Sequence, residues 1–227
     1  MQNIEKNLID INHQIESAAL EFKRDPKDIS LLAVSKKKPT EDIRGAYACG
    51  QRDFGENYLQ EALEKVEELS DLNIVWHFIG AVQSNKTRPL AQNFHWVHCI
   101  DRLKTAKRLS EQRPQSMPPL NLCIQVNVDQ EASKAGVRLD EVDQLAEKIA
   151  ELPAIRLRGL MAIPAPQADF DSQRKPFAQL RQALERLNHK GLDCDTLSMG
   201  MTHDMDAAIA EGATVVRIGT AIFGERL

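Results

Sequence analysis

The chain has 227 residues, of which 42% are hydrophobic and 27% charged, and its formal net charge is −4. This composition is ordinary for a globular protein, and the length suffices for one large domain or two small ones. The negative net charge argues against a general nucleic-acid binder. No apolar run is long enough to span a membrane, and the N-terminus lacks the long apolar block of a secretory signal.

The four cysteines lie far apart in the sequence and form no C-x-x-C pair. A reduced, cytoplasmic compartment is the simplest interpretation. No low-complexity tract or linker divides the chain, and the proline-rich segment 113–120 is typical of a loop between a helix and a strand. We therefore expect a cytoplasmic protein with a single domain over residues 1–227.

The predicted elements begin with an amphipathic helix over residues 1–22 and continue with eight short apolar segments that favour β-strands. The strand segments cover residues 30–36, 52–56, 74–80, 95–100, 121–128, 155–163, 195–200 and 214–219. Between them lie helical patterns, such as residues 139–152 and 172–190, with apolar residues three and four positions apart.

The strand segments do not alternate strictly in polarity, which is typical of parallel strands that helices cover on both faces. Eight such strands with helices between them predict a (β/α)8 TIM barrel with an extra N-terminal helix. The alternative is an open doubly wound sheet. That fold usually carries a G-x-G-x-x-G turn after its first strand, and the sequence has no such turn.

Three consecutive lysines stand where the first predicted strand finishes, at the end where barrel active sites lie. Because side chains alternate along a strand, Lys36 and Lys38 share one side with Val34, and Lys37 points the other way. Pro39 ends regular pairing, so Lys36 is best placed to enter the barrel mouth. On this segment alone, a solvated basic rim is the simpler interpretation.

The segments at the last two predicted strands favour a phosphate site. After the seventh strand, Gly200 allows close approach of the backbone, Ser198 supplies a hydroxyl, and Thr202 is a predicted N-cap of a helix over residues 203–211. After the eighth strand, Gly219 and Thr220 again offer amides and a hydroxyl. Each loop alone is more often a cap or a turn, but two such loops on consecutive strands favour a phosphate site.

A lysine amine facing a phosphate site suggests a phosphorylated aldehyde or ketone held as a Schiff base, such as pyridoxal phosphate or a ketose phosphate. Seven segments that span residues 31–224 in order support the first ligand. They are LLAVSKKKP, FGENYLQEA, WHFIGAVQSNK, IDRLKTAKRL, QVNVDQEASKAGV, RLRGLMAIP and LSMGMTHDMDAAIAEGATVVRIGTAIFG. With these segments the chain resembles the pyridoxal phosphate homeostasis protein family, also described as proline-synthase co-transcribed proteins.

The resemblance implies a barrel similar to the N-terminal domain of alanine racemase and of bacterial-type ornithine decarboxylase. It implies pyridoxal 5'-phosphate (PLP) in a Schiff base with Lys36, and Arg217 beside the pyridine nitrogen. It implies that Asn57 and His77 line the pocket. The residues implied to bind the phosphate are Ser198, Met201, Thr202, Gly219 and Thr220; the family commonly has serine where this chain has Thr202.

The resemblance also implies a monomer that holds and buffers PLP for vitamin B6 homeostasis and delivers it to PLP-dependent enzymes, without substantial turnover. A charged Arg217 disfavours protonation of the pyridine nitrogen and so makes the ring a poorer electron sink. Racemases of this type have a second domain with a catalytic tyrosine, whereas this chain ends after the eighth strand and its Tyr58 is the only tyrosine expected near the rim. The alternatives are an amino-acid racemase or decarboxylase on the same scaffold, and a class I aldolase.

Two further features carry weaker hypotheses. His95, His98 and Cys99 suggest a zinc site, but residues three apart on a strand face opposite sides, so the two histidines are expected not to share an ion. Lys134 follows the fifth strand and is a candidate acceptor of the cofactor in a transfer step.

Overall fold

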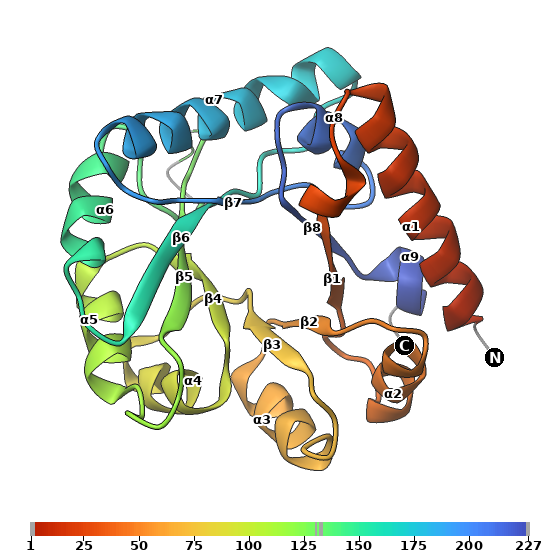
Figure 1. Ribbon diagram of the computed structural model, residues 1–227, viewed down its shortest axis with the longest axis horizontal. Coiled ribbons are helices and arrows are strands. Elements are labelled where there is room, and N and C mark those ends of the chain that lie inside the picture. Colours follow the sequence, from red (N-terminus) through yellow and green to blue (C-terminus); the bar gives the residue numbers. More distant parts are fainter. Residues whose placement is uncertain (1–2, 130, 132–133, 226–227) are drawn as a thin grey trace.

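The computed structural model describes residues 3–129, 131 and 134–225, and its centre is a closed barrel of eight parallel strands (Figure 1). The strands pair in sequence order, and the last returns to pair with the first. They are β1 (Ser30–Val34), β2 (Asp53–Glu56), β3 (Val75–Phe78), β4 (Trp96–Ile100), β5 (Leu120–Gln125), β6 (Ile155–Met161), β7 (Thr196–Ser198) and β8 (Val215–Ile218). The predicted TIM barrel is confirmed, and an open sheet is excluded.

Helices surround the barrel and cover the outer faces of its strands (Figure 1). They are α1 (Ile4–Glu21), α2 (Thr40–Ala48), α3 (Leu59–Glu68), α4 (Thr87–Asn93), α5 (Leu103–Gln112), α6 (Val142–Ala150), α7 (Phe170–His189), α8 (Met205–Ala210) and α9 (Thr220–Phe223), with 3-10 turns at Pro26–Asp28 and Ser84–Lys86. The extra helix α1 packs against α2, α8 and α9, and thereby covers the junction between the first and last strands. None of the helices within the described ranges is both long and apolar enough to cross a membrane.

Several element boundaries differ from the predicted ones. Three strands end earlier than predicted. The strands predicted over residues 30–36, 121–128 and 155–163 end at Val34, Gln125 and Met161. The chain leaves the barrel after these residues, although some of the residues that follow are also buried. The predicted N-cap Thr202 is wrong. Helix α8 begins at Met205 with Asp204 as its N-cap residue, and the Asp204 carboxylate accepts a hydrogen bond from the Met201 N–H at 2.6 Å.

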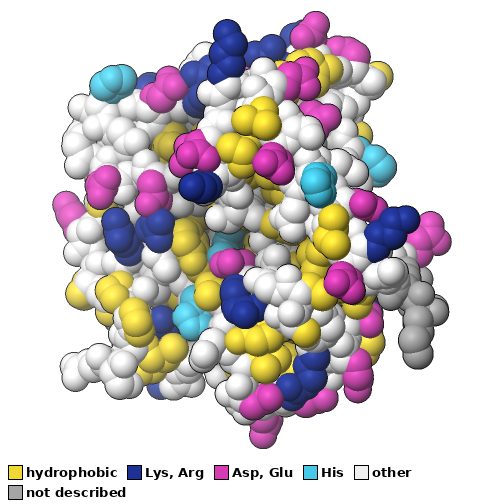
Figure 2. Space-filling view, turned by 45° about the vertical axis from the view of Figure 1, so that its right-hand side comes forward, with side chains coloured by type: hydrophobic (Ala, Val, Ile, Leu, Met, Phe, Trp, Pro, Cys, Tyr) yellow, Lys and Arg dark blue, Asp and Glu magenta, His cyan; other side chains and the backbone are white. Residues whose placement is uncertain are grey.

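The barrel interior contains polar side chains from strands on opposite sides of the barrel, and this decides what lies beneath the barrel mouth. Strands β3, β4, β7 and β8 direct His77, His98, Ser198 and Arg217 inwards, where all four are buried. The apolar core lies mainly outside the barrel, between strands and helices. On the face shown in Figure 2, Lys and Arg side chains are interspersed with Asp and Glu. Among the described residues, that face therefore has no extended basic surface of the kind that binds a phosphate backbone.

Candidate functional site

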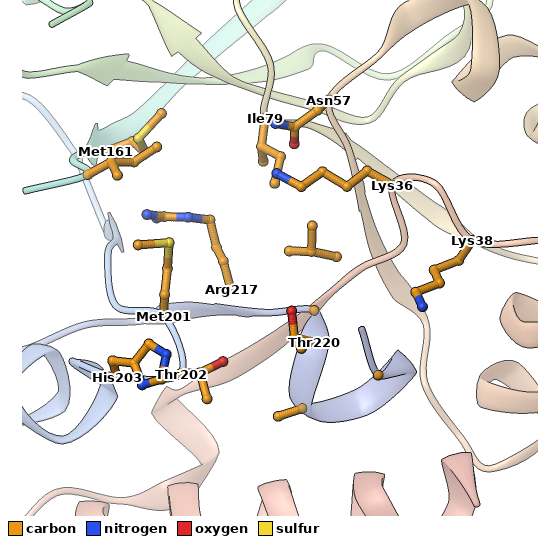
Figure 3. A pocket seen from close by; sticks show the side chains of 15 residues that line it. Lys36, Lys38, Asn57, Ile79, Met161, Met201, Thr202, His203, Arg217 and Thr220 are labelled. Atoms are coloured by element: carbon orange, nitrogen blue, oxygen red, sulfur yellow. The ribbon is translucent and has the colours of Figure 1, made fainter. Parts of the chain in front are cut away.

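A cavity of about 430 Å³ opens at the carboxyl ends of the strands, and its volume lies in the range of small-molecule sites. Lys36 and Arg217 point into it from opposite sides, and Thr202 and Thr220 lie along one edge (Figure 3). Seven of the nine residues predicted to bind the cofactor line this cavity. They are Lys36, Asn57, Met201, Thr202, Arg217, Gly219 and Thr220.

The loop after β1 places the three lysines as their spacing predicts. Lys36 and Lys38 both line the cavity, whereas Lys37 is exposed and its ammonium lies over the Tyr58 ring, 5.7 Å from the centroid. Lys38 is held at the edge, since its amine donates to the Glu225 carbonyl at 2.7 Å. Lys36 is therefore the lysine whose side chain extends into the cavity, with its amine on the side of Asn57 and Ile79 (Figure 3).

A buried ionic cluster behind β1 and β2 fixes this loop. Lys65 of α3 donates to Glu56 at 2.8 Å, to Glu61 at 2.6 Å and to the Ser35 carbonyl at 2.8 Å. The Ser35 hydroxyl donates to Glu56 at 2.6 Å. Burial raises the pKa of Glu56 in spite of the adjacent Lys65 ammonium. Sequence reasoning missed this cluster, because Lys65 lies among charged residues that are typical of an exposed helix face.

Two glycines shape the opposite side of the cavity, where the predicted phosphate loops lie. Gly200 has φ +92°, and a Cβ there would lie 2.6 Å from the Ala208 Cβ. A Cβ at Gly219 would lie 3.1 Å from the Val34 carbonyl oxygen. The loops after β7 and β8 therefore pass close to their neighbours and leave their amides and hydroxyls at the cavity wall.

Asn57 supplies the observation that points most directly to a ligand. Its Oδ1 atom is buried and has no hydrogen-bond partner among the described residues. A buried acceptor of this kind is costly unless something donates to it. Together with the amine, the guanidinium and the loop amides, it fits a small ligand with an aldehyde, a donor group and a phosphate, and PLP has these features.

Arg217 lies at the floor of the cavity and is fixed by two hydrogen bonds. Its guanidinium donates to the Ser198 hydroxyl and to the Ala162 carbonyl, both at 2.9 Å. Burial lowers the pKa of Arg217, but a guanidinium remains charged at neutral pH. The cavity thus has a fixed positive charge beneath the ligand position, and none of its described lining residues is a carboxylate.

The structure corrects the placement of His77 and Ser198. Both side chains are buried beneath the cavity and do not line it. The two-residue period of β3 places His77 one layer deeper and Ile79 at the mouth. The Ser198 hydroxyl, predicted to bind phosphate, instead bonds Arg217 and the His98 ring. Sequence reasoning missed the lining residues Ile79 and Ile163. The two-residue period indicates which side of the strand they face, but only the closed barrel shows that they lie at the level of the cavity.

The structure bears on the two remaining hypotheses, the zinc site at His95 and His98 and the transfer role of Lys134. His95 bonds the Trp76 N–H at 3.0 Å whereas His98 lies inside the barrel, so the two rings do not face a common ion. Within the described part of the chain, no group of three or more His, Cys, Asp or Glu residues could hold a metal. Lys134 pairs with Asp129 at 2.5 Å and does not line the cavity, so its role in transfer stays a prediction.

Comparisons with known proteins agree with this geometry. The family model for the alanine racemase N-terminal domain matches residues 7–227. The pyridoxal phosphate homeostasis protein of Pseudomonas aeruginosa is 58% identical over 226 residues, which cover 100% of this chain and 97% of that protein. The protein of the same name from Escherichia coli K12 is 50% identical, with coverage of 100% and 98%. The chain belongs to the pyridoxal phosphate homeostasis protein family.

Solved structures support the family and the fold. PipY of Synechococcus elongatus PCC7942, in its structure with PLP bound, is 35% identical with a TM-score of 0.86, covering 98% of this chain and 100% of that chain. Alanine racemase from Corynebacterium glutamicum is 18% identical with a TM-score of 0.71, covering 98% of this chain and 61% of that chain. The second likeness concerns the fold alone, and it confirms the predicted similarity to the racemase barrel.

Proposed function

We propose that this protein binds PLP through a Schiff base with Lys36 and takes part in intracellular vitamin B6 homeostasis, without substantial turnover of its own. The observation that carries this proposal is the convergence of the Lys36 amine, the buried Arg217 guanidinium and the two glycine-shaped loops on one cavity. The names of the relatives in P. aeruginosa and E. coli, and the PLP bound to PipY, support the same ligand.

Each lining group has a proposed task. Lys36 forms the covalent bond, and Arg217 lies beside the pyridine nitrogen. Asn57 offers its unpartnered oxygen to a donor on the ligand. The phosphate is held by the loop at Met201 and Thr202 and the loop at Gly219 and Thr220. PLP, when bound, supplies an aldehyde that captures amines and a ring that can withdraw electrons.

Two features of the site favour holding the cofactor over using it in catalysis. The positive charge of Arg217 disfavours a proton on the pyridine nitrogen, which weakens the ring as an electron sink. The cavity wall is open to water, since Met201 is 38% and Ile163 43% exposed. Water access lowers the benefit of fixed dipoles and charges in a reaction. Tyr58, the candidate acid or base, is 49% exposed and lies outside the cavity lining.

The proposal also covers the oligomeric state of the protein, its compartment and the recipients of its cofactor. The protein works as a monomer in the cytoplasm, and the recipients of its cofactor are PLP-dependent enzymes. Size-exclusion chromatography with light scattering tests the monomer. Transfer is tested by mixing the loaded protein with an apoenzyme of this class and following the gain of enzyme activity and the loss of colour from the carrier.

The deciding experiment is a visible spectrum of the purified protein, followed by borohydride reduction and peptide mapping. A yellow protein with the label on Lys36 supports the proposal, and a label on Lys38 contradicts the assignment of the anchor. A colourless protein that PLP does not reconstitute would instead favour the aldolase alternative, with a sugar phosphate as ligand. Robust, Lys36-dependent racemisation or decarboxylation of amino acids would replace the carrier function with an enzymatic one.

A further inference from the structure

A continuous chain of hydrogen bonds runs through the barrel from the cavity floor to the opposite end. Arg217 donates to the Ser198 hydroxyl at 2.9 Å, and that hydroxyl lies 2.8 Å from Nδ1 of His98. Nε2 of His98 lies 2.9 Å from Nδ1 of His77, and Nε2 of His77 lies 2.9 Å from Oδ1 of Asp53. Asp53 is the first residue of β2 and therefore lies at the amino end of the barrel, where its side chain is 37% exposed.

The two end residues of this hydrogen-bond chain, Arg217 and Asp53, determine which atom donates at each link. An arginine can only donate, and an ionised aspartate can only accept. With both rings neutral, His77 must donate from Nε2 to Asp53 and accept at Nδ1. His98 must then donate from Nε2 and accept at Nδ1 from the Ser198 hydroxyl, whose lone pair accepts from Arg217. One arrangement of protons satisfies all four links.

The surroundings of the two rings favour the neutral state that this arrangement needs. Both rings are buried, and burial lowers the pKa of His77 and, further, that of His98, which also lies near the Arg217 charge. The His77 ring stacks on Trp96, with centroids 5.4 Å apart and 6° between the planes. Rings that are packed in this way have little freedom to reorient.

We propose that Ser198, His98, His77 and Asp53 are positioning residues, which hold the Arg217 guanidinium in one orientation through a fixed order of protons. A carboxylate at the far end of the barrel thereby influences the environment of the ligand's ring without touching the ligand. The coupling to the ligand rests on the proposed PLP function. The order of protons within the chain does not depend on it.

The proton order is tested first, on the protein without PLP. Long-range ¹H–¹⁵N correlation spectra of ¹⁵N-histidine-labelled protein at neutral pH distinguish the two neutral tautomers and the cation. We expect His77 and His98 both to be neutral with the proton on Nε2. A cationic ring, or a proton on Nδ1 of either residue, would overturn the proposed order.

Transmission along the chain is tested with two near-isosteric variants. Asp53→Asn removes the terminal charge, and its matched control is Asp193→Asn, which removes an exposed carboxylate between α7 and β7 that takes no part in the chain. We expect Asp53→Asn to shift the ring nitrogen signals of His98, which Asp53 does not touch. Asp193→Asn should leave them unchanged. Equal His98 signals in the two variants would show that the charge of Asp53 does not affect His98.

Coupling to the ligand is measured by PLP titration of the same proteins. A further variant, Ser198→Ala, removes the hydrogen bond between Ser198 and Arg217. Losing a hydrogen bond to a charged group predicts about 10-fold weaker binding for Ser198→Ala and a smaller loss for Asp53→Asn, each with a shifted absorption band of bound PLP. Thermal unfolding checks that the variants are folded. Unchanged affinity and spectra in both variants would overturn the coupling. If the wild type binds no PLP, the proposed function and the coupling to the ligand both fail. The histidine tautomers measured without PLP still test the proposed order of protons.

Discussion

Two lysines close to the β1–β2 wall, Lys36 and Lys65, lie on opposite sides of it and have different surroundings. Lys65 is buried and bonds two carboxylates, Glu56 and Glu61. Lys36 enters a cavity whose described lining residues include Arg217 and Lys38 but no carboxylate. The comparison shows that neighbours decide the role of an amine. Among carboxylates it serves as a structural cation, whereas a wall of cations and amides suits a phosphorylated ligand.

The sharpest test of this difference is the loss of the cavity amine. Lys36→Ala should abolish covalent PLP binding and weaken the affinity by roughly 100-fold or more, because only the non-covalent contacts of the phosphate loops, Asn57 and Arg217 remain to bind the ligand. Absorption spectra and equilibrium dialysis measure both effects. The matched control is Lys38→Ala, which removes a neighbouring amine at the cavity edge and should keep the visible band. A native spectrum in Lys36→Ala would assign the anchor to another lysine.

The buried amine should show the opposite behaviour, with a loss of stability. Lys65→Met leaves the Glu56 carboxylate buried without its cation, which predicts a loss of about 3–5 kcal/mol in the free energy of unfolding. Urea denaturation measures this loss. As a control, Arg44→Ala breaks the exposed pair with Asp71 and should scarcely move the midpoint. A midpoint shift in Lys65→Met as small as that of the control would mean that the cluster contributes little.

The cavity wall opposite Lys36 can be tested with a pair of glycines. Gly200 and Gly50 have similar left-handed φ angles, +92° and +97°, but a Cβ at Gly50 would have nothing within 4 Å, whereas one at Gly200 would meet Ala208. Gly50→Ala should therefore cost only the backbone strain of about 1 kcal/mol, and Gly200→Ala roughly 1–3 kcal/mol more. Only Gly200→Ala should also weaken PLP binding. Equal costs would show that the loop relaxes without strain.

The smallest expected effect concerns the interior histidines. Folding lowers the pKa of His77 and His98 below the ordinary value of about 6.5, so only the unfolded chain takes up their protons below that pH. The contribution of the two histidines to the free energy of unfolding is therefore fully present above about pH 6.5. It falls with decreasing pH, by up to about 1.4 kcal/mol per pH unit for each ring.

Urea unfolding of the wild type and of His98→Asn between pH 7.5 and 5.5 checks this dependence. The raised pKa of Glu56 acts in the opposite direction, since its contribution is lost as the pH rises. Because Glu56 is unchanged in His98→Asn, the difference between the two slopes isolates the histidine. Identical slopes would contradict a neutral, buried His98.

The barrel, the order of its elements and the position of Lys36 at its mouth all followed from the sequence. They depend on local information: apolar periodicity marks strands and helices, the carboxyl ends of parallel strands meet at one rim, and alternation separates Lys36 from Lys37. The resemblance added the choice of PLP among phosphorylated carbonyl ligands. The task of each lining residue stays a prediction.

Tertiary structure alone decided the depth of each side chain in the barrel and the partners of the buried charges. Alternation indicates that His77 points inwards, but only the register of β3 within the closed barrel places it beneath the cavity with Ile79 above it. The cluster at Lys65 and the chain from Arg217 to Asp53 join residues from different elements, up to 100 positions apart. Barrel closure brings such residues together, and no local pattern records which distant side chains will then share a hydrogen bond.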